Sequence, residues 1–211
     1  MFVELLEYLR CPRSHEESSL IVSATRTRDR HIVDGVLGCP VCNAEFRIEA
    51  GVARFTDRAP PARPEPPSDE AAMRLAAFLQ LTDARGAAAL CGRFASHAGG
   101  VAAITDAPLV VVNAPTALDV DAAASLVVDD SLPLAAGSLR GAAIDESVGA
   151  ALAASVVRAV RSGGRLVGAA PSPVPAGVTE LARDDRVWIA EKDAAPEVTA
   201  PRLVSIGRAP R

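Results

Sequence analysis

Residues 57–68 of the chain read DRAPPARPEPPS, and five of them are proline. Proline has no backbone N–H and restricts φ, so a proline-rich stretch holds an extended, semi-rigid conformation. We therefore place a linker here, between a first domain over residues 1–56 and a second over residues 69–211. We expect this linker to uncouple the folding of the two domains.

The composition narrows the classes of protein to which the chain can belong. Hydrophobic residues make up 49% of the 211 residues, but only seven are aromatic, which suits tightly packed helix-on-sheet layers. A net charge of −4, scattered arginines and a single lysine disfavour nucleic-acid binding through a strong electrostatic footprint. With no export signal and no apolar run long enough to span a membrane, we expect a cytoplasmic protein.

Three of the four cysteines fall within the first 42 residues, which favours metal ligation over disulfides in such a chain. The segment Cys39-Pro40-Val41-Cys42 has the spacing of a knuckle that directs two thiolates at one ion. Cys11-Pro12 begins a second knuckle, with Ser14 two residues beyond the proline and His15 next. The sequence therefore predicts tetrahedral zinc on Cys11, His15, Cys39 and Cys42. The alternative is that the metal has been lost and the cysteines are ordinary buried thiols.

A structural metal would also explain how the first domain folds. Fifty-six residues bury a small core, and small domains commonly gain the missing stability from a bound ion. The fourth cysteine, Cys91, lies far from the others in the sequence and is interpreted as a small core residue.

After the linker, short apolar runs alternate with helical patterns, which predicts right-handed crossovers and a mainly parallel sheet. Ser68 is placed to cap the first helix, because serine oxygens accept hydrogen bonds from helix N-terminal amides. Two late apolar runs predict a terminal antiparallel hairpin. The expected helices are 69–81 and 147–161, the expected strands are 87–91, 109–113, 125–129, 141–145 and 165–170, and the hairpin joins 187–190 to 203–207.

The first 56 residues resemble a known family. LLEYLRCP at 5–12, DGVLGCPVC at 34–42, FRI at 46–48 and GVARF at 51–55 occur in its order. The family consists of small zinc-ribbon proteins that bind and activate tRNA, rRNA and release-factor methyltransferases. The resemblance implies a zinc-ribbon domain and a protein partner. Ser14 stands where that family usually has a cysteine.

The second domain resembles class I S-adenosylmethionine-dependent methyltransferases. Two segments carry the likeness: SLPLAAGSL at 131–139 is similar to the family's loop and turn before its fourth strand, and VRSGGRLV at 160–167 to its turn into the fifth. The resemblance implies a Rossmann-like α/β fold with a cofactor at the carboxyl ends of the first strands.

The cofactor positions implied by this resemblance depart from the family's pattern. Gly92 is a single glycine where two or three are expected, and Arg93 and Phe94 follow it. Asn113 ends the second strand where an acidic residue would hold the ribose. We interpret Gly92, Asn113 and Asp129 as vestiges of a cofactor site, so S-adenosylmethionine binding is not expected.

The residues near the fourth strand do not complete a catalytic site either. Arg140 replaces a usual acidic residue, and Asp145 and Glu146 end the strand on the substrate side without a recognisable partner base. No catalytic residue is assigned.

Three functions remain open from the sequence. The favoured one is a non-catalytic protein that acts as a scaffold or as a subunit of a larger protein complex. The second is a methyltransferase with an unusual cofactor turn that acts on RNA or protein. The third is an adaptor that binds RNA through the ribbon alone. Because a fold does not carry a function with it, S-adenosylmethionine binding separates the first from the second.

Overall fold

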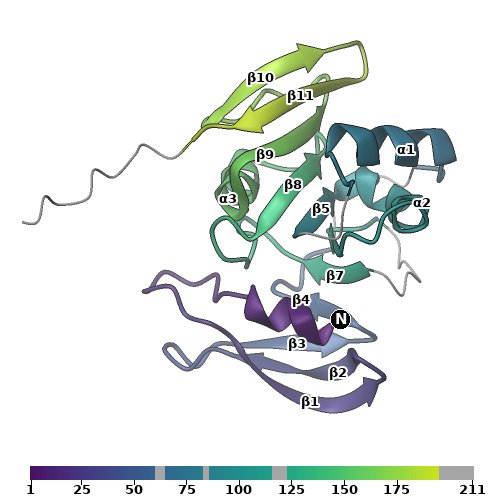
Figure 1. Ribbon diagram of the computed structural model, residues 1–211. Helices are drawn as coiled ribbons and strands as arrows, with labels where there is room; N and C mark the ends of the chain where they lie inside the picture. The colour runs from purple at the N-terminus through teal and green to yellow at the C-terminus, as the bar shows by residue number, and fades with distance from the viewer. Residues whose placement is uncertain (60–64, 83–85, 116–122, 195–211) are drawn as a thin grey trace, which may run out of the picture.

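The strands of the described residues form one sheet of eleven (Figure 1). A computed structural model of the chain describes residues 1–59, 65–82, 86–115 and 123–194. The sheet order is β1-β2-β3-β4-β7-β6-β5-β8-β9-β11-β10. Within this described part, no helix is long and apolar enough to cross a membrane.

The N-terminal part of the sheet is an antiparallel meander, which we call the N-terminal meander and define as β1 to β4. A short 3-10 helix, η1 (Val3–Glu7), precedes it. Its strands are β1 (Ile21–Arg28), β2 (His31–Gly38), β3 (Glu45–Glu49) and β4 (Val52–Arg54). In β3 exposed and buried positions alternate strictly, as expected when one face of a strand packs on a core.

The remaining elements form an α/β unit. Its strands run in the order β7-β6-β5-β8-β9, all parallel, with an antiparallel hairpin, β11-β10, on the far edge. Helices α1 and α2 cover one face and α3 covers the other (Figure 1). The elements are α1 (Asp69–Phe78), β5 (Ala87–Cys91), η2 (Gly92–His97), α2 (Ala98–Ala102), β6 (Leu109–Val112), β7 (Ala123–Val127), β8 (Leu139–Ile144), α3 (Ala150–Ala159), β9 (Val160–Ala169), β10 (Val178–Arg183) and β11 (Val187–Lys192).

The expected α/β class and the five parallel strands are confirmed, although the sheet as a whole is mixed. Strand β5 has the bounds that its apolar run predicts. Helix α1 begins at Asp69, and the Ser68 Oγ accepts a hydrogen bond from the Ala71 amide at 3.3 Å, so the expected cap is also present.

Two expectations near the C-terminus need correction. The expected stop after the helix, Ser162-Gly163-Gly164, lies inside β9, which starts at Val160 and bulges between its pairings with Leu139 and Gly141. The terminal hairpin joins β11 to β10, a strand that the sequence analysis missed because its side chains are nearly all exposed. Residues 203–207, the expected partner strand, lie outside the described residues.

The sheet runs without a break from the N-terminal meander into the α/β unit. Strand β4 pairs in parallel with β7, with Ala53 opposite Leu126, and the amide of Phe55 donates to the Val127 carbonyl at 2.8 Å. On a second line of contact, Leu9 bridges to Leu134. The division into two domains stays a prediction, but a shared sheet leads us to expect that both parts unfold together, in place of the uncoupling predicted from the linker.

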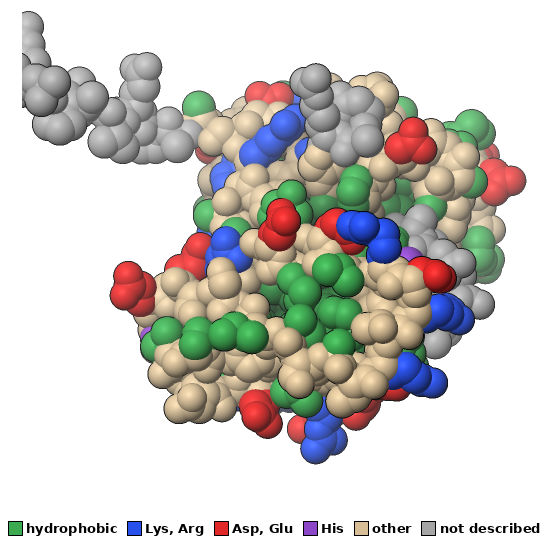
Figure 2. Space-filling model, turned by 60° about the horizontal axis from the view of Figure 1, so that its bottom comes forward, with side chains coloured by type: hydrophobic (Ala, Val, Ile, Leu, Met, Phe, Trp, Pro, Cys, Tyr) green, Lys and Arg blue, Asp and Glu red, His purple; other side chains and the backbone are tan. Residues whose placement is uncertain are grey.

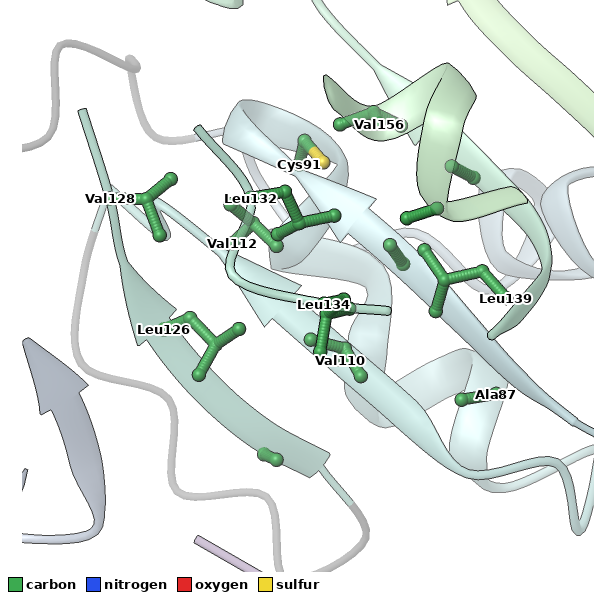
Figure 3. Packing of buried hydrophobic residues seen from close by; sticks show 14 of the residues in the cluster. Ala87, Cys91, Val110, Val112, Leu126, Val128, Leu132, Leu134, Leu139 and Val156 are labelled. Atoms are coloured by element: carbon green, nitrogen blue, oxygen red, sulfur yellow. The ribbon is translucent and has the colours of Figure 1, made fainter. Parts of the chain in front are cut away.

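One buried cluster extends across both parts of the chain. It combines Leu9, Leu37 and Ile48 from the N-terminal side with Leu126 and Leu134 from the α/β unit. Figure 3 shows the α/β side of this core, where the 131–134 segment places Leu132 and Leu134 over the side chains of β6 and β7. Part of the 131–139 segment, one of the two that carry the methyltransferase resemblance, therefore lies in the packed core.

The far edge of the sheet depends on a close aromatic contact. Trp188 on β11 is completely buried and pairs with Gly168 on β9. A Cβ built on Gly168 would overlap the indole ring, so glycine leaves the space that the ring occupies. The indole Nε1 donates to the Ser172 carbonyl at 3.0 Å, which fixes the ring's orientation.

We expect Gly168→Ala to lower the free energy of unfolding by about 1–3 kcal/mol, because the indole must move out of a packed site. Urea denaturation followed by the fluorescence of Trp188, the single tryptophan, measures it. Gly99→Ala is the control, since a Cβ there meets nothing within 4 Å. Equal stabilities of the two variants would contradict the contact.

Candidate functional site

The cysteine and histidine side chains singled out in the sequence meet at one point. The ligand atoms of Cys11, His15, Cys39 and Cys42 all lie within 4.8 Å of one another. The Cys11 and Cys42 sulfurs are 3.8 Å apart, and the Cys39 sulfur is 3.4 Å from the His15 Nε2. Tetrahedral zinc with Zn–S bonds of about 2.3 Å and Zn–N bonds of about 2.0–2.1 Å places such atom pairs about 3.5–3.8 Å apart. The residues therefore fit a zinc ion.

The His15 ring is oriented for ligation. Its Nδ1 lies 2.6 Å from the Glu16 carbonyl oxygen. A carbonyl oxygen only accepts, so Nδ1 carries the hydrogen and Nε2 keeps a free lone pair directed at the cluster. A backbone carbonyl that holds the second ring nitrogen is a common support for a metal-bound histidine. His15 therefore offers a fourth ligand atom beside the three sulfurs, one position after Ser14.

The hydrogen-bonding environment favours a thiolate at the knuckle. Burial acts to raise the pKa of Cys39, but hydrogen bonds from the Cys42 and Val41 backbones outweigh it and lower that pKa to about 6. Burial raises the pKa of Cys11 to about 11. Because the thiolate is the form that ligates metal, Cys39 is prepared for an ion, and a bound cation would favour loss of the Cys11 proton as well.

The predicted cofactor crevice is occupied by a side chain of the protein. In a doubly wound sheet, ligands bind where the strand order reverses, here between the carboxyl ends of β5 and β8. Asp145, which follows β8, is 3% exposed and lies against Gly92, which follows β5. The Asp145 carboxylate accepts hydrogen bonds from the Arg93 amide at 2.7 Å and the Ser147 amide at 3.0 Å. It therefore ties the two loops together across the crevice.

Gly92 has a structural reason to be glycine. Its φ is +62°, in the left-handed region that disfavours other residues, and a Cβ there would overlap both carboxylate oxygens of Asp145. The single glycine of the first turn therefore makes room for a carboxylate of the chain itself. The sequence analysis named both residues but missed their contact, because they are far apart in the sequence.

The other two expected cofactor positions have different environments. Asn113 is 6% exposed, and its Oδ1 accepts from the Val128 amide at 2.8 Å, so its side chain links the ends of β6 and β7. Asp129 lies at the surface, and both its oxygens are 2.9 Å from the Arg58 guanidinium at the start of the predicted linker. The structure thus brings Gly92 and Asp145 together but gives Asn113 and Asp129 local partners.

The remaining residues singled out near the crevice have structural roles. Arg140 is 8% exposed and donates to the Gln80 carbonyl. Glu146 lies 3.5 Å from an Arg93 guanidinium nitrogen. Cys91 is completely buried, as expected for a core residue, and burial raises the pKa of its thiol.

Comparison with known proteins gives distant structural likenesses. No family profile and no curated protein sequence matches the chain. A chain from the complex between the Haloferax volcanii Trm112 methyltransferase activator and a methyltransferase is 16% identical, with a TM-score of 0.36, over 46% of this chain and 51% of that chain. The T. thermophilus 16S rRNA methyltransferase RsmC, in complex with S-adenosylmethionine and guanosine, is 16% identical, with a TM-score of 0.34, over 75% of this chain and 45% of that chain. The chain thus spans about half the length of each.

We expect the purified protein to hold about one equivalent of zinc, and Cys39→Ser to lose it, because a hydroxyl is a poor replacement for a thiolate ligand. Elemental analysis after dialysis measures the stoichiometry. Cys91→Ala is the matched control and should keep the ion, since Cys91 lies outside the cluster. Folded wild-type protein without a transition metal would contradict the assignment.

We expect Gly92→Ala to destabilise the protein by about 2–4 kcal/mol, from left-handed strain and overlap with Asp145. Gly99→Ala is the control, because a Cβ at Gly99 meets nothing within 4 Å and alanine favours the helix there. Thermal and urea unfolding compare the two. If both variants were as stable as the wild type, the Asp145 carboxylate would not occupy this position.

Proposed function

We propose that the chain is a non-catalytic protein, a zinc ribbon fused to a methyltransferase-like domain, that works as a scaffold or subunit of a larger protein complex. The observation that carries the proposal is the Asp145 carboxylate in the crevice between β5 and β8. A methyl donor of the expected class would need that space, and its own carboxylate would meet a second negative charge there.

The ribose side of the crevice also supports this proposal. An acidic residue at the end of β6 would accept hydrogen bonds from the sugar, but Asn113 has no charge and its oxygen is engaged by the Val128 amide. A hydrogen bond to a charged group contributes about 1.5–3 kcal/mol, so its absence would weaken binding by roughly tenfold or more. Together with the filled crevice, this favours a role that does not use the cofactor.

The arrangement of the ribbon supports a role as a preassembled unit. An open sheet edge presents unpaired backbone amides and carbonyls and therefore invites further pairing. Strand β4 covers the β7 edge within the same chain. The proposed ribbon therefore has its sheet partner built in, and further partners would bind elsewhere on its surface.

One exposed face offers such a surface. Figure 2, which brings the lower side of Figure 1 forward, shows apolar side chains gathered around a hollow. On the N-terminal meander, Ile21, Val22, Val36 and Pro40 line an open hollow of about 420 Å³, and Ile21 is 64% exposed. Apolar side chains grouped at the surface are typical of a protein interface. RNA binding is less favoured, because the net charge of the chain is −4.

We expect no S-adenosylmethionine binding at submillimolar concentration. Calorimetric titration of the zinc-loaded full chain measures it, and an unchanged unfolding temperature with the ligand is the second readout, because a ligand that binds the folded state raises that temperature. A dissociation constant in the low micromolar range would instead favour a methyltransferase acting on RNA or protein. In that case Gly92→Ala should abolish binding, and Gly99→Ala should not.

A further inference from the structure

A second cavity lies away from the crevice, on the face of the sheet that α1 covers. It has a volume of about 330 Å³, at the lower end of the range for small-molecule sites. Asp145, which fills the crevice, does not line this cavity. One wall is apolar and consists of Leu75, Phe78, Phe94, Val167 and Val187.

Two hydrogen-bond donors point at one place in this cavity. His97 is 2% exposed, and its Nδ1 lies 3.4 Å from the Ser68 amide, which donates to it. The hydrogen of the neutral ring is therefore on Nε2, which faces the Glu65 Oε1 at 3.8 Å. The Nε of Arg93 is buried, has no hydrogen-bond partner among the described residues, and faces the Glu65 Oε2 at 3.6 Å. Both donors thus approach the same carboxylate.

Glu65 fills this place poorly. Both separations exceed the roughly 2.7–3.2 Å that is typical of a hydrogen bond from nitrogen to oxygen. The side chain is 41% exposed and belongs to the proline-rich linker, with Pro66 and Pro67 directly after it. These prolines restrict the backbone at Glu65, so its carboxylate can change place only by side-chain rotation. A free carboxylate has no such restriction.

The charges around the cavity call for one carboxylate. Three arginines line it. Arg93 is also 3.5 Å from Glu146, and Arg74 is 3.4 Å from Asp184. Arg186 is the third arginine, so the Glu65 carboxylate is the third negative charge that offsets the three positive charges. A ligand carboxylate that displaced Glu65 would keep this balance, because Glu65 would move into water with its charge solvated.

We propose that this cavity binds a small monocarboxylate with an apolar body. Its carboxylate replaces that of Glu65 between the Arg93 Nε and the His97 Nε2, and its body lies against Leu75, Phe78 and Val167. Glu65 acts as a competitor attached to the chain. The apolar wall selects an organic acid over inorganic phosphate, because burying that wall stabilises the complex only when the ligand has apolar surface. This site is independent of the S-adenosylmethionine crevice.

Phenylacetate is a suitable probe, and phenylacetamide is its uncharged counterpart. Calorimetric titration of the zinc-loaded full chain, up to about 10 mM of probe, covers the affinity expected for ten non-hydrogen atoms. We expect Glu65→Gln to bind phenylacetate at least about fivefold more tightly than the wild type, because the uncharged side chain competes less well for Arg93 and His97. Glu70→Gln removes the same charge from an exposed helix position and should leave the affinity unchanged. Arg93→Gln should weaken binding by about tenfold.

The gain in affinity keeps the test independent of misfolding, since a misfolded variant would not bind more tightly. Binding by Glu65→Gln but not by the wild type would overturn the proposal, because Glu65 would then close the cavity instead of competing for it. Equal affinities for phenylacetate and phenylacetamide would overturn it. So would an equal effect of Glu65→Gln and Glu70→Gln, binding of inorganic phosphate as tight as that of phenylacetate, or no binding by any variant.

Discussion

Strand β4 and strand β7 pair through Val52 with Ser125, Ala53 with Leu126 and Arg54 with Val127, and the rest of the structure is arranged around this junction. A parallel sheet that ended at β7 would leave a row of backbone amides and carbonyls without partners. The N-terminal meander supplies those partners and closes the sheet edge. The same junction brings Leu37 and Ile48 into one core with Leu126, so neither part buries its apolar surface alone.

The metal cluster is connected to this junction through a short segment. Cys11 follows Arg10, whose amide donates to the Pro133 carbonyl at 2.9 Å, and Leu9 bridges to Leu134. An ion on Cys11 and Cys39 would tie this segment to the hairpin between β2 and β3. The 131–134 segment is held from its other side by α3, where the Ser155 Oγ accepts from the Leu132 amide at 2.8 Å. Metal binding would therefore stabilise contacts that reach well into the α/β unit.

The short helix η2 lies between the crevice and the second cavity, and these two sites differ in how well their polar groups are hydrogen-bonded. Its backbone amide at Arg93 faces the Asp145 carboxylate in the crevice, while the Arg93 side chain faces the second cavity. The crevice is filled by the Asp145 carboxylate, both of whose oxygens accept hydrogen bonds, whereas the cavity holds Glu65 at distances too long for hydrogen bonds. A filled, satisfied site resists a ligand, and an under-satisfied one favours it. This contrast is why the two places lead to different expectations.

Local patterns in the sequence were sufficient to predict most of the helices and strands of the α/β unit. The apolar run of β5, the serine cap of α1 and the alternation of strands and helices follow from hydrophobic periodicity and backbone hydrogen bonding, which act between near neighbours. The spacing of Cys39 and Cys42 likewise predicted half of the metal cluster. Strand β10 was not predicted, because its mostly exposed side chains show no alternation of apolar and polar residues.

Tertiary structure decided what distant residues do to one another. The proline-rich stretch at 57–68 predicts two separate domains, yet β4, which precedes it, pairs with β7, which follows it. The pairing is favourable because backbone amides and carbonyls without partners cost free energy. Gly92 and Asp145 were each singled out in the sequence, but their contact arises only because β5 and β8 are neighbours in the sheet. Glu65, Arg93 and His97 similarly meet only in the folded chain. The sequence predicted most of the elements of the α/β unit and the candidate metal ligands, and the packing of those elements determined that Asp145 lies against Gly92 and that Glu65 faces Arg93 and His97.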